Sequence, residues 1–336
     1  MGKYQPDSGG QVLITVLMSV YNTQKKFLVE AIESVLHQTY SDFEFIIVND
    51  CSDEGTTALL RKYEKMDERI VLIENGKNLG LTKSLNLGLK QAKGRYIARL
   101  DSDDSCNLER LKLQLSYMQS HPGTTVVGCR VHDQYGKRGK IAIMPNEWRK
   151  VQLITSNCGL VHSSAFIDAE FLRSNNIFYD ETKKRAQDYK LWTDIVANGG
   201  IIDIMSDDLV MFRRHKESIS VKYREEQVAA ALLISCEQLS RLLVGWTDQR
   251  LYELIESLDK MREDSLADES SKAGRIQLRQ LLVEACVNNE HQQLYDSHIL
   301  RYELMYFYNK HIGRQEWFSV GYWGYRVVRA MYKYMR

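Results

Sequence analysis

Apolar and polar positions follow two different patterns along the chain, and the change between them falls near residue 224. In the first part, short apolar runs alternate with segments whose apolar residues recur every three or four positions. This alternation of strands and helices predicts crossover units and a mostly parallel sheet. The predicted strands are 12–20, 43–48, 69–73 and 95–100, and the predicted helices are 27–37, 56–65, 81–92 and 108–119.

After Gly123 the pattern is less regular, which indicates that the second half of the sheet is mixed in direction. A turn containing glycine at 135–139 separates two short apolar runs. We predict strands at 125–131, 140–144, 201–205 and 209–213, an extended segment at 160–167, and helices at 148–154 and 188–197.

From residue 224 onward every segment has helical periodicity, interrupted by a polar, acidic connection at 263–271. The predicted helices are 227–244, 251–261, 277–287, 299–308 and 317–334. The chain is therefore predicted to have three parts: a flexible N-terminus at 1–11, an α/β domain at 12–224 and a helical region at 225–336.

Composition excludes several classes of protein. The formal net charge of +1 gives no general attraction to nucleic acid. The six cysteines are scattered without metal-type spacing, so we expect reduced thiols and a cytoplasmic protein. The first ten residues are polar, unlike a signal peptide, and no apolar run approaches the ~20 residues that span a bilayer.

Three carboxylates, Asp101, Asp103 and Asp104, directly follow the predicted strand at 95–100. Three neighbouring anions repel one another unless a cation lies among them, and Mg²⁺ or Mn²⁺ bound to a phosphorylated substrate is the usual one. The alternative is a solvated acidic turn before the helix that starts near Asn107. The carboxyl edge of an open α/β sheet is where ligands bind, and this position favours the metal site.

Four further polar motifs fall at the ends of predicted elements on the same side of the sheet. Each has a structural alternative: Asp50 or Asp53 as a helix N-cap, the Asn/Gly pair as a turn, and Asp188 as a first-turn acid. The motifs are Ser-Val-Tyr-Asn at 19–22, Val-Asn-Asp-Cys-Ser-Asp-Glu-Gly-Thr at 48–56, Asn-Leu-Gly-Leu-Thr-Lys-Ser-Leu-Asn at 78–86 and Ala-Gln-Asp-Tyr-Lys-Leu-Trp at 186–192.

In this order and spacing, the five motifs resemble those of the family 2 glycosyltransferases of the GT-A fold, which are inverting enzymes that use sugar nucleotides. The resemblance covers residues 12–222 and leaves the helical region outside. It implies a mixed sheet flanked by helices and a Mn²⁺- or Mg²⁺-dependent transfer of one sugar, with a UDP-sugar as the expected donor. The expected acceptor is a hydroxyl of a glycan or lipid-linked molecule in bacterial surface polysaccharide synthesis.

The resemblance also implies roles for individual residues. Asp188 matches the catalytic base, with a structural N-cap as the alternative, and Asp50 would accept the imide N–H of uracil. Asp101 would act through water or by positioning its loop. The other implied roles are nucleotide binding by Ser19, Tyr21, Asn22 and Asp103, metal binding by Asp104, Asp103 and His215, diphosphate contacts by Arg213 and Arg214, and acceptor contact by His162. His215 could instead contact the diphosphate, and a solvated basic surface is the alternative for His215, Arg213 and Arg214.

Some features depart from the family pattern or leave alternatives open. His162 could equally be a hydrogen-bonded core residue, and Lys83 is expected at the solvated surface. Cys51 stands where many members have glycine, so the turn is expected to avoid a positive φ there. The chain has no Gln-x-x-Arg-Trp motif, which favours single transfer over processive synthesis.

The sequence also bears on two alternative functions, a nucleotidyltransferase and a silent binding protein, and on the role of the C-terminal tail. A sugar-nucleotide nucleotidyltransferase would carry a glycine-rich loop after the first strand, which 20–24 lacks, and a silent binding protein of the same fold would have lost the acidic residues. Residues 297–336 hold eleven aromatics, seven Lys/Arg and two acids. This composition favours a peripheral membrane contact over packing against the protein or within a homodimer.

Overall fold

The computed structural model describes residues 13–139, 145–215, 218–263 and 269–312. The chain forms two compact units, 1–142 with 159–222 and 143–158 with 223–336. We predicted one boundary at 224/225 and placed 143–158 in the α/β domain. The structure assigns 143–158 to the helical unit, because Val151 and Ile154 are buried in its core. The predicted N-terminal segment 1–11 lies outside the described residues.

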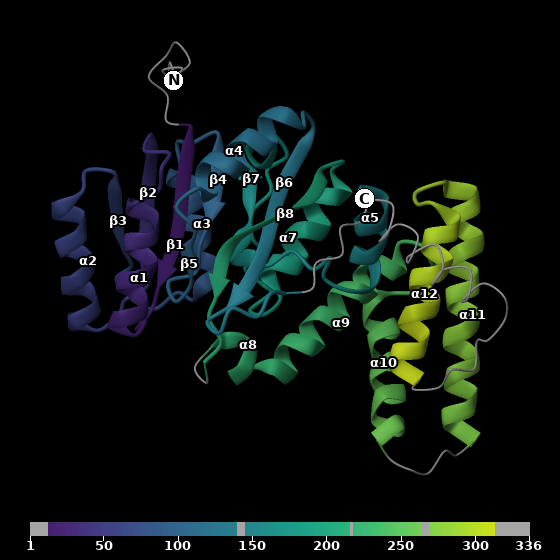
Figure 1. The fold of residues 1–336 in the computed structure, drawn as a ribbon. Helices are drawn as coiled ribbons and strands as arrows, with labels where there is room; N and C mark the ends of the chain where they lie inside the picture. The colour runs from purple at the N-terminus through teal and green to yellow at the C-terminus, as the bar shows by residue number, and fades with distance from the viewer. Residues whose placement is uncertain (1–12, 140–144, 216–217, 264–268, 313–336) are drawn as a thin grey trace. The chain divides into compact units, whose positions relative to one another are not determined.

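The first unit is built on one eight-stranded sheet with the order β3-β2-β1-β4-β7-β6-β8-β5 (Figure 1). β1, β2, β3 and β4 are parallel, whereas β7 runs antiparallel to both β4 and β6. The predicted mixed sheet is therefore confirmed. The strands are β1 (Ile14–Val20), β2 (Phe43–Asn49), β3 (Ile70–Glu74), β4 (Tyr96–Arg99), β5 (Ser105–Cys106), β6 (Thr124–Asp133), β7 (Phe166–Asp168) and β8 (Ile201–Phe212).

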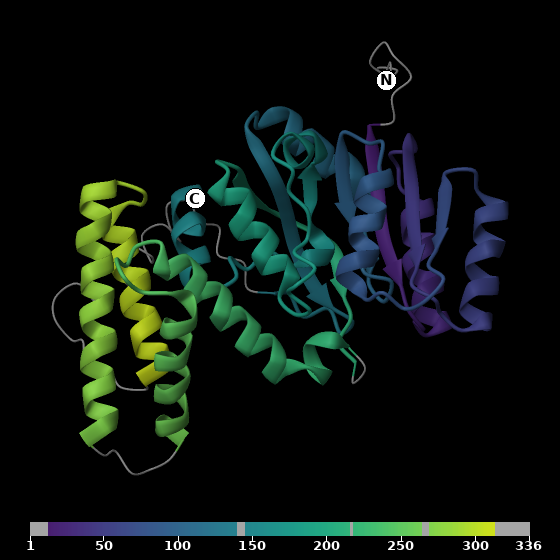
Figure 2. The ribbon, with the colours of Figure 1, turned by 180° about the vertical axis from the view of Figure 1, so that it is seen from behind.

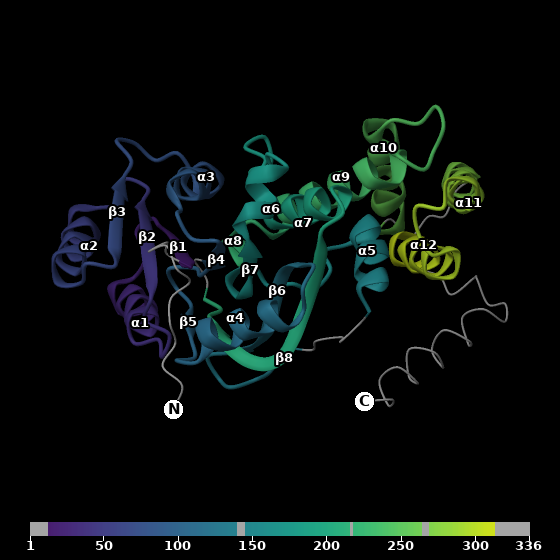
Figure 3. The same ribbon diagram turned by 90° about the horizontal axis from the view of Figure 1, so that it is seen from above.

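Helices cover both faces of this sheet. Leu28, Leu60 and Leu115, from α1, α2 and α4, share one core cluster with alternate residues of β1 and β2, while Gly88 of α3 packs on the other face against Leu17. Figure 3 shows α1 and α4 on one side and α3 and α7 on the other. The helices are α1 (Lys25–Leu36), α2 (Glu54–Met66), α3 (Leu81–Gln91), α4 (Arg110–Ser120), α6 (Ala169–Ser174), α7 (Gln187–Ala197) and α8 (Ile219–Lys222).

Several predicted elements differ from the structure. The two strands predicted at 201–205 and 209–213 are one strand, β8, because pairing with β6 resumes at Asp208, opposite Arg130, after a register shift that follows Ile204. The extended segment predicted at 160–167 contains a 3₁₀ turn (His162–Ser164) before β7. The short elements β5 and α6 were not predicted, and the predicted strand at 140–144 lies outside the described residues.

The second unit is helical, as predicted. Figure 2 shows α10, α11 and α12 side by side, and the buried core includes Leu251, Leu278 and Leu304 from these three helices. α11 begins at Glu269 rather than at residue 277, and the helix predicted at 317–334 lies outside the described residues. The helices are α5 (Asn146–Thr155), α9 (Arg224–Ser240), α10 (Asp248–Glu263), α11 (Glu269–Gln292) and α12 (Ser297–Ile312).

The described part of the chain contains no helix with the length and apolar character needed to cross a bilayer.

Candidate active site

The parallel strands place four polar loops at one edge of the sheet. The loops after β1 and β2 are joined by Asn22, whose backbone N–H donates to Ser52 Oγ (3.1 Å) and whose Oδ1 accepts from the Asp53 N–H (2.7 Å). Asp53 caps α2 through the Thr56 N–H (2.7 Å), which confirms the capping interpretation for this residue. Ser19 is half-buried near the end of β1, and Tyr21 is exposed beside it.

Asp50 is the buried centre of this edge, with 1 % of its surface exposed. Its carboxylate accepts three hydrogen bonds, from Asn75 Nδ2 (2.8 Å), the Leu79 N–H (2.7 Å) and the Gly80 N–H (2.8 Å). Gly80 has φ +86° where α3 begins, a conformation that glycine adopts without a steric penalty. Asp50 therefore holds the loop after β3 in place, a role that sequence reasoning did not predict.

Cys51 contradicts one prediction from the sequence. Its φ is +60°, in the left-handed region that the turn was expected to avoid. Asp50 is held on both sides, because its N–H donates to the Val20 carbonyl (2.8 Å) and its side chain binds the loop after β3. The following residue must therefore turn sharply whatever its side chain, and the left-handed conformation costs an L-residue about 1–2 kcal/mol.

Replacement of Cys51 by glycine is expected to raise the free energy of unfolding by about 1 kcal/mol. Glycine removes the steric cost of the left-handed conformation. This gain in free energy exceeds the loss that comes from the greater entropy of glycine in the unfolded chain. The measurement is the urea midpoint of the α/β unit. Cys51→Ala is the matched control, because it removes the thiol and keeps the strain. An equal midpoint for the glycine and alanine variants would contradict the prediction.

The acidic loop after β4 brings Asp101, Asp103 and Asp104 together, with one ligand atom from each within 4.8 Å of the others. Burial, and then the charges of Asp101 and Asp103, raise the pKa of Asp104 well above its usual range. Burial and the charge of Asp101 also raise the pKa of Asp103. For Asp101, burial acts in the same direction but the charge and hydrogen bond of Arg99 outweigh it, so the pKa is lowered.

Arg99 and Ser163 form the buried support of this loop. Arg99 is 1 % exposed, forms an ion pair with Asp101 and donates from Nη1 to Ser163 Oγ (3.0 Å). Ser163 Oγ lies within hydrogen-bonding distance of both Asp101 and Asp104 and has one proton to donate to either. Sequence reasoning missed both residues, although a charged residue inside an apolar strand was a signal that a partner must exist.

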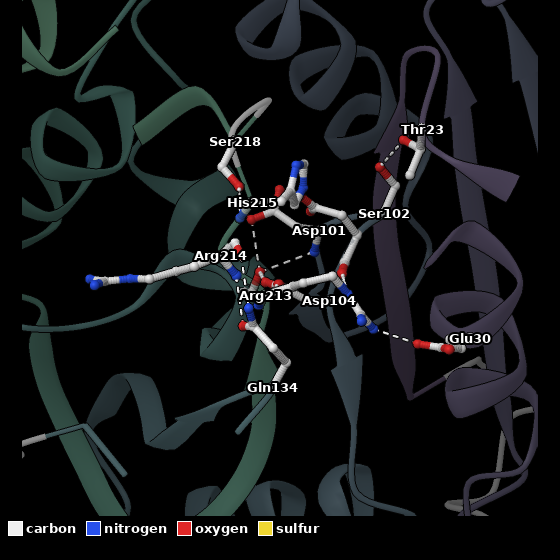
Figure 4. A network of polar contacts seen from close by, with 12 residues as sticks. Thr23, Glu30, Asp101, Ser102, Asp104, Gln134, Arg213, Arg214, His215 and Ser218 are labelled. Atoms are coloured by element: carbon white, nitrogen blue, oxygen red, sulfur yellow. Dashed lines mark hydrogen bonds and ion pairs between the residues drawn. The ribbon is translucent and has the colours of Figure 1, made fainter. Parts of the chain in front are cut away.

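The segment after β8 closes the loop from the other side (Figure 4). The Arg213 N–H donates to Asp104 Oδ1 (2.8 Å) and its Nε donates to the Asp103 carbonyl (2.8 Å). Its guanidinium also forms an ion pair with Glu30 and lies 4.2 Å from the centre of the Phe27 ring. Arg213 thus ties the acidic loop to α1.

His215 and Arg214 lie differently with respect to the acidic loop. His215 Nε2 is 2.9 Å from Asp103 Oδ2, so the imidazole and the carboxylate form a pair. The Arg214 side chain is exposed and extends away from the acidic residues in Figure 4. Lys83 is exposed, as expected from the sequence.

His162 is a buried residue beside the same loop. Its Nε2 lies 2.6 Å from Tyr179 Oη, and its ring meets the Trp192 ring edge-on at 6.2 Å. Burial, followed by the charge of Arg99, lowers the pKa of His162 well below its usual range. The imidazole is therefore neutral at neutral pH.

Asp188 is the second residue of α7 and is half-buried. The N-cap of this helix is Ala186, at φ +54°, so the interpretation of Asp188 as the N-cap is wrong. Burial raises the pKa of Tyr179, and the charges of Asp188 and Asp101 add to this rise while Arg99 opposes it. The Tyr179 hydroxyl thus lies within electrostatic reach of both Asp188 and the acidic loop.

Comparison with known proteins identifies the family. The model for glycosyl transferase family 2 matches residues 15–178. An uncharacterized glycosyltransferase of Methanocaldococcus jannaschii is 33 % identical over 207 residues, covering 60 % of this chain and 70 % of the relative. The chain belongs to glycosyl transferase family 2.

Two other comparisons cover more of this glycosyltransferase. The amylovoran biosynthesis glycosyltransferase AmsE of Erwinia amylovora is 27 % identical over 262 residues, which are 74 % of this chain and 94 % of that protein. The structure of S. aureus TarS 1-349 in complex with UDP-GlcNAc matches with a TM-score of 0.59 and 19 % identity, covering 90 % of each chain. This similarity supports the predicted GT-A fold.

The acidic loop of this glycosyltransferase fits a divalent cation. Carboxylate oxygens are the donors that Mg²⁺ and Mn²⁺ prefer, and three carboxylates lie close enough to share one ion. Burial and mutual repulsion raise the pKa values of Asp103 and Asp104, and a cation would relieve the repulsion. Asp103 and Asp104, with His215, are the residues that would hold it.

Proposed function

We propose that this glycosyltransferase is an inverting, metal-dependent enzyme that moves one sugar from a UDP-sugar to a hydroxyl of a glycan or lipid-linked acceptor. A bacterial cell-surface polysaccharide pathway is the proposed setting. AmsE is named for amylovoran biosynthesis, and TarS is described in complex with UDP-GlcNAc. These relatives support the donor and the setting.

The single observation that carries this proposal is the buried His162–Tyr179 pair, which contacts both carboxylate-bearing segments. Ser163, next to His162, bonds to Asp104 of the acidic loop, and the His162 ring meets Trp192 of α7, the helix that carries Asp188. The acidic loop offers buried carboxylates for a cation, and Asp188 offers a carboxylate on a different element. Both influence the Tyr179 hydroxyl electrostatically. Donor activation and proton removal require two such carboxylate sites close together.

We assign the donor side to the loops after β1, β2 and β4. Ser19, Tyr21 and Asn22 would border the nucleoside. Asp50 has three of its four acceptor positions in use, and we propose the fourth for the imide N–H of uracil. A cation held by Asp103, Asp104 and His215 would neutralise the charge that develops on the departing UDP.

We assign the acceptor side to α7 and the 3₁₀ turn. Asp188 would take the proton of the acceptor hydroxyl at its carboxylate as the oxygen bonds to the anomeric carbon and the bond to UDP breaks. Attack from the face opposite UDP inverts the anomeric configuration. His162, buried and bonded to Tyr179, would shape the acceptor side, while Arg213 holds the acidic loop.

The first experiment is calorimetric titration of the full chain with UDP in the presence of Mn²⁺ and again in the presence of EDTA. Binding that requires the metal supports the donor site. An NMR spectrum of the product, formed from an α-linked UDP-sugar and a glycan or lipid-linked acceptor, should then show a β-linkage. Retention would exclude the proposed mechanism. Binding of GDP or dTDP instead would change the donor, and no nucleotide binding would indicate a silent binding protein.

A further inference from the structure

The helical unit carries an apolar groove between α11 and α12. Its surface is almost wholly apolar, and Arg301 is the one charged residue among the described residues that line it. The other lining residues are Leu282, Val283, Cys286 and Val287 from α11 and Leu304 and Met305 from α12.

The groove continues into an exposed apolar stripe on α11. Ile276, Val283 and Val287 are 51 %, 47 % and 46 % exposed, and their spacing places them on one side of the helix. Tyr306 on α12 is also 51 % exposed. A contiguous apolar surface of this kind usually contacts another part of a protein or a partner. The described residues therefore cover only about half of the surface of each side chain in this stripe.

We propose that residues 313–336 of the same chain cover this face. The segment starts immediately after Ile312, the last residue of α12, which itself forms one wall of the groove. A glycine directly after a helix commonly reverses the chain, and Gly313 stands at that position. Trp317 and Phe318 follow soon enough to return alongside α12.

The length of the segment supports this occupant, and the exposed groove offers its apolar residues an alternative to the membrane contact that the sequence alone favoured. Even the ~1.5 Å rise per residue of a helix, the shortest common backbone course, would let the 24 residues after Ile312 reach along the 24-residue α11. The segment contains seven aromatic residues and, besides them, valine and methionine, which need cover from water. Its covalent attachment gives it an effective concentration in the millimolar range, so a second copy or a membrane would have to displace it.

Alkylation of Cys286 tests the proposal, because this thiol lines the groove. The rate of reaction with N-ethylmaleimide is followed by peptide mass spectrometry in the full chain and in a chain ending at Ile312. We expect the reaction to be at least ~10-fold faster in the shortened chain. Cys51 is exposed and should react alike in both, whereas buried Cys129 and Cys236 should stay unreactive if the shortened chain is folded.

A full-length variant provides the second test. Trp317→Asp with Phe318→Asp should accelerate alkylation of Cys286, whereas Gln315→Asp, the matched control, should not. Equal rates in the full and shortened chains would overturn the proposal. Protection that increases with protein concentration would indicate a second copy, and protection that requires anionic vesicles would indicate a membrane. Either result would also overturn it.

Discussion

The Asp188→Asn variant is expected to lose a factor of about 10²–10⁴ in kcat, because a positioned general base contributes that much to proton transfer. The amide keeps the size and the polarity of the side chain, but it cannot accept a proton. UDP binding should remain within about threefold, since Asp188 is assigned to the acceptor side. The measurement is initial-rate kinetics with donor and acceptor, together with calorimetry of UDP.

Asp194→Asn is the matched control for this variant. Asp194 lies on the same helix and forms an ion pair with Lys190, so its loss tests any general effect of removing a carboxylate from α7. Its kcat should stay within about threefold of the parent. A kcat for Asp188→Asn in that same range would remove Asp188 from the mechanism without affecting the family assignment.

The stability of the metal-free protein is expected to change in opposite directions when Asp104 and Asp101, two carboxylates of the acidic loop, are each replaced by Asn. Asp104→Asn should stabilise the metal-free protein, because it removes a buried charge from beside Asp101 and Asp103. Asp101→Asn should destabilise it by about 3–5 kcal/mol, because the buried Arg99 loses its ion-pair partner. With Mn²⁺, Asp104→Asn should lose about 100-fold or more in metal affinity, since even residues behind the ligands account for 10–100-fold.

The pH dependence of these differences has a definite sign. The folded pKa of Asp104 is raised, so its ionised form costs stability at neutral pH, and this cost disappears as the pH falls through the folded pKa toward about 3.9. The folded pKa of Asp101 is lowered, so its stabilisation is present above about 3.9 and is lost as the pH falls through the folded pKa.

Urea unfolding in EDTA at a series of pH values measures both effects. Asp207→Asn, on an exposed residue of β8, is the control and should leave stability nearly unchanged. Destabilisation by Asp104→Asn at neutral pH would contradict the prediction. It would show that the hydrogen bonds from Ser163 and Arg213 to the charged carboxylate stabilise the protein more than its burial and repulsion destabilise it.

Periodicity predicted the parallel half of the sheet well, because β1, β2 and β4 are short apolar runs buried on both faces. It failed at β8, where Ser206, Asp207 and Asp208 look like a break. Strand pairing with β6 overrides that local signal, and hydrogen bonds between distant segments are not visible in a local pattern.

The candidate site shows the same division between local motifs, which the sequence reveals, and contacts between distant residues, which it does not. The acidic loop and Asp188 are local motifs, so the sequence displays them directly. Ser163 and Glu30 act on the site through residues 59 and 183 positions away, and only the folded sheet brings them there. Cys51 shows a second limit, because the surrounding hydrogen bonds impose a backbone conformation that its own side chain disfavours.

The bond from the Arg213 N–H to Asp104 spans 109 positions, and it has a consequence for when the proposed metal site forms during folding. The family model ends at residue 178, before α7 and β8. A nascent chain of that length already carries every acidic residue of the loop, yet one wall of the loop is missing. Closing so long a segment is slow, so affinity for the metal should arise late in folding, when the last strand has paired. The appearance of metal affinity during refolding would then mark the completion of the α/β unit.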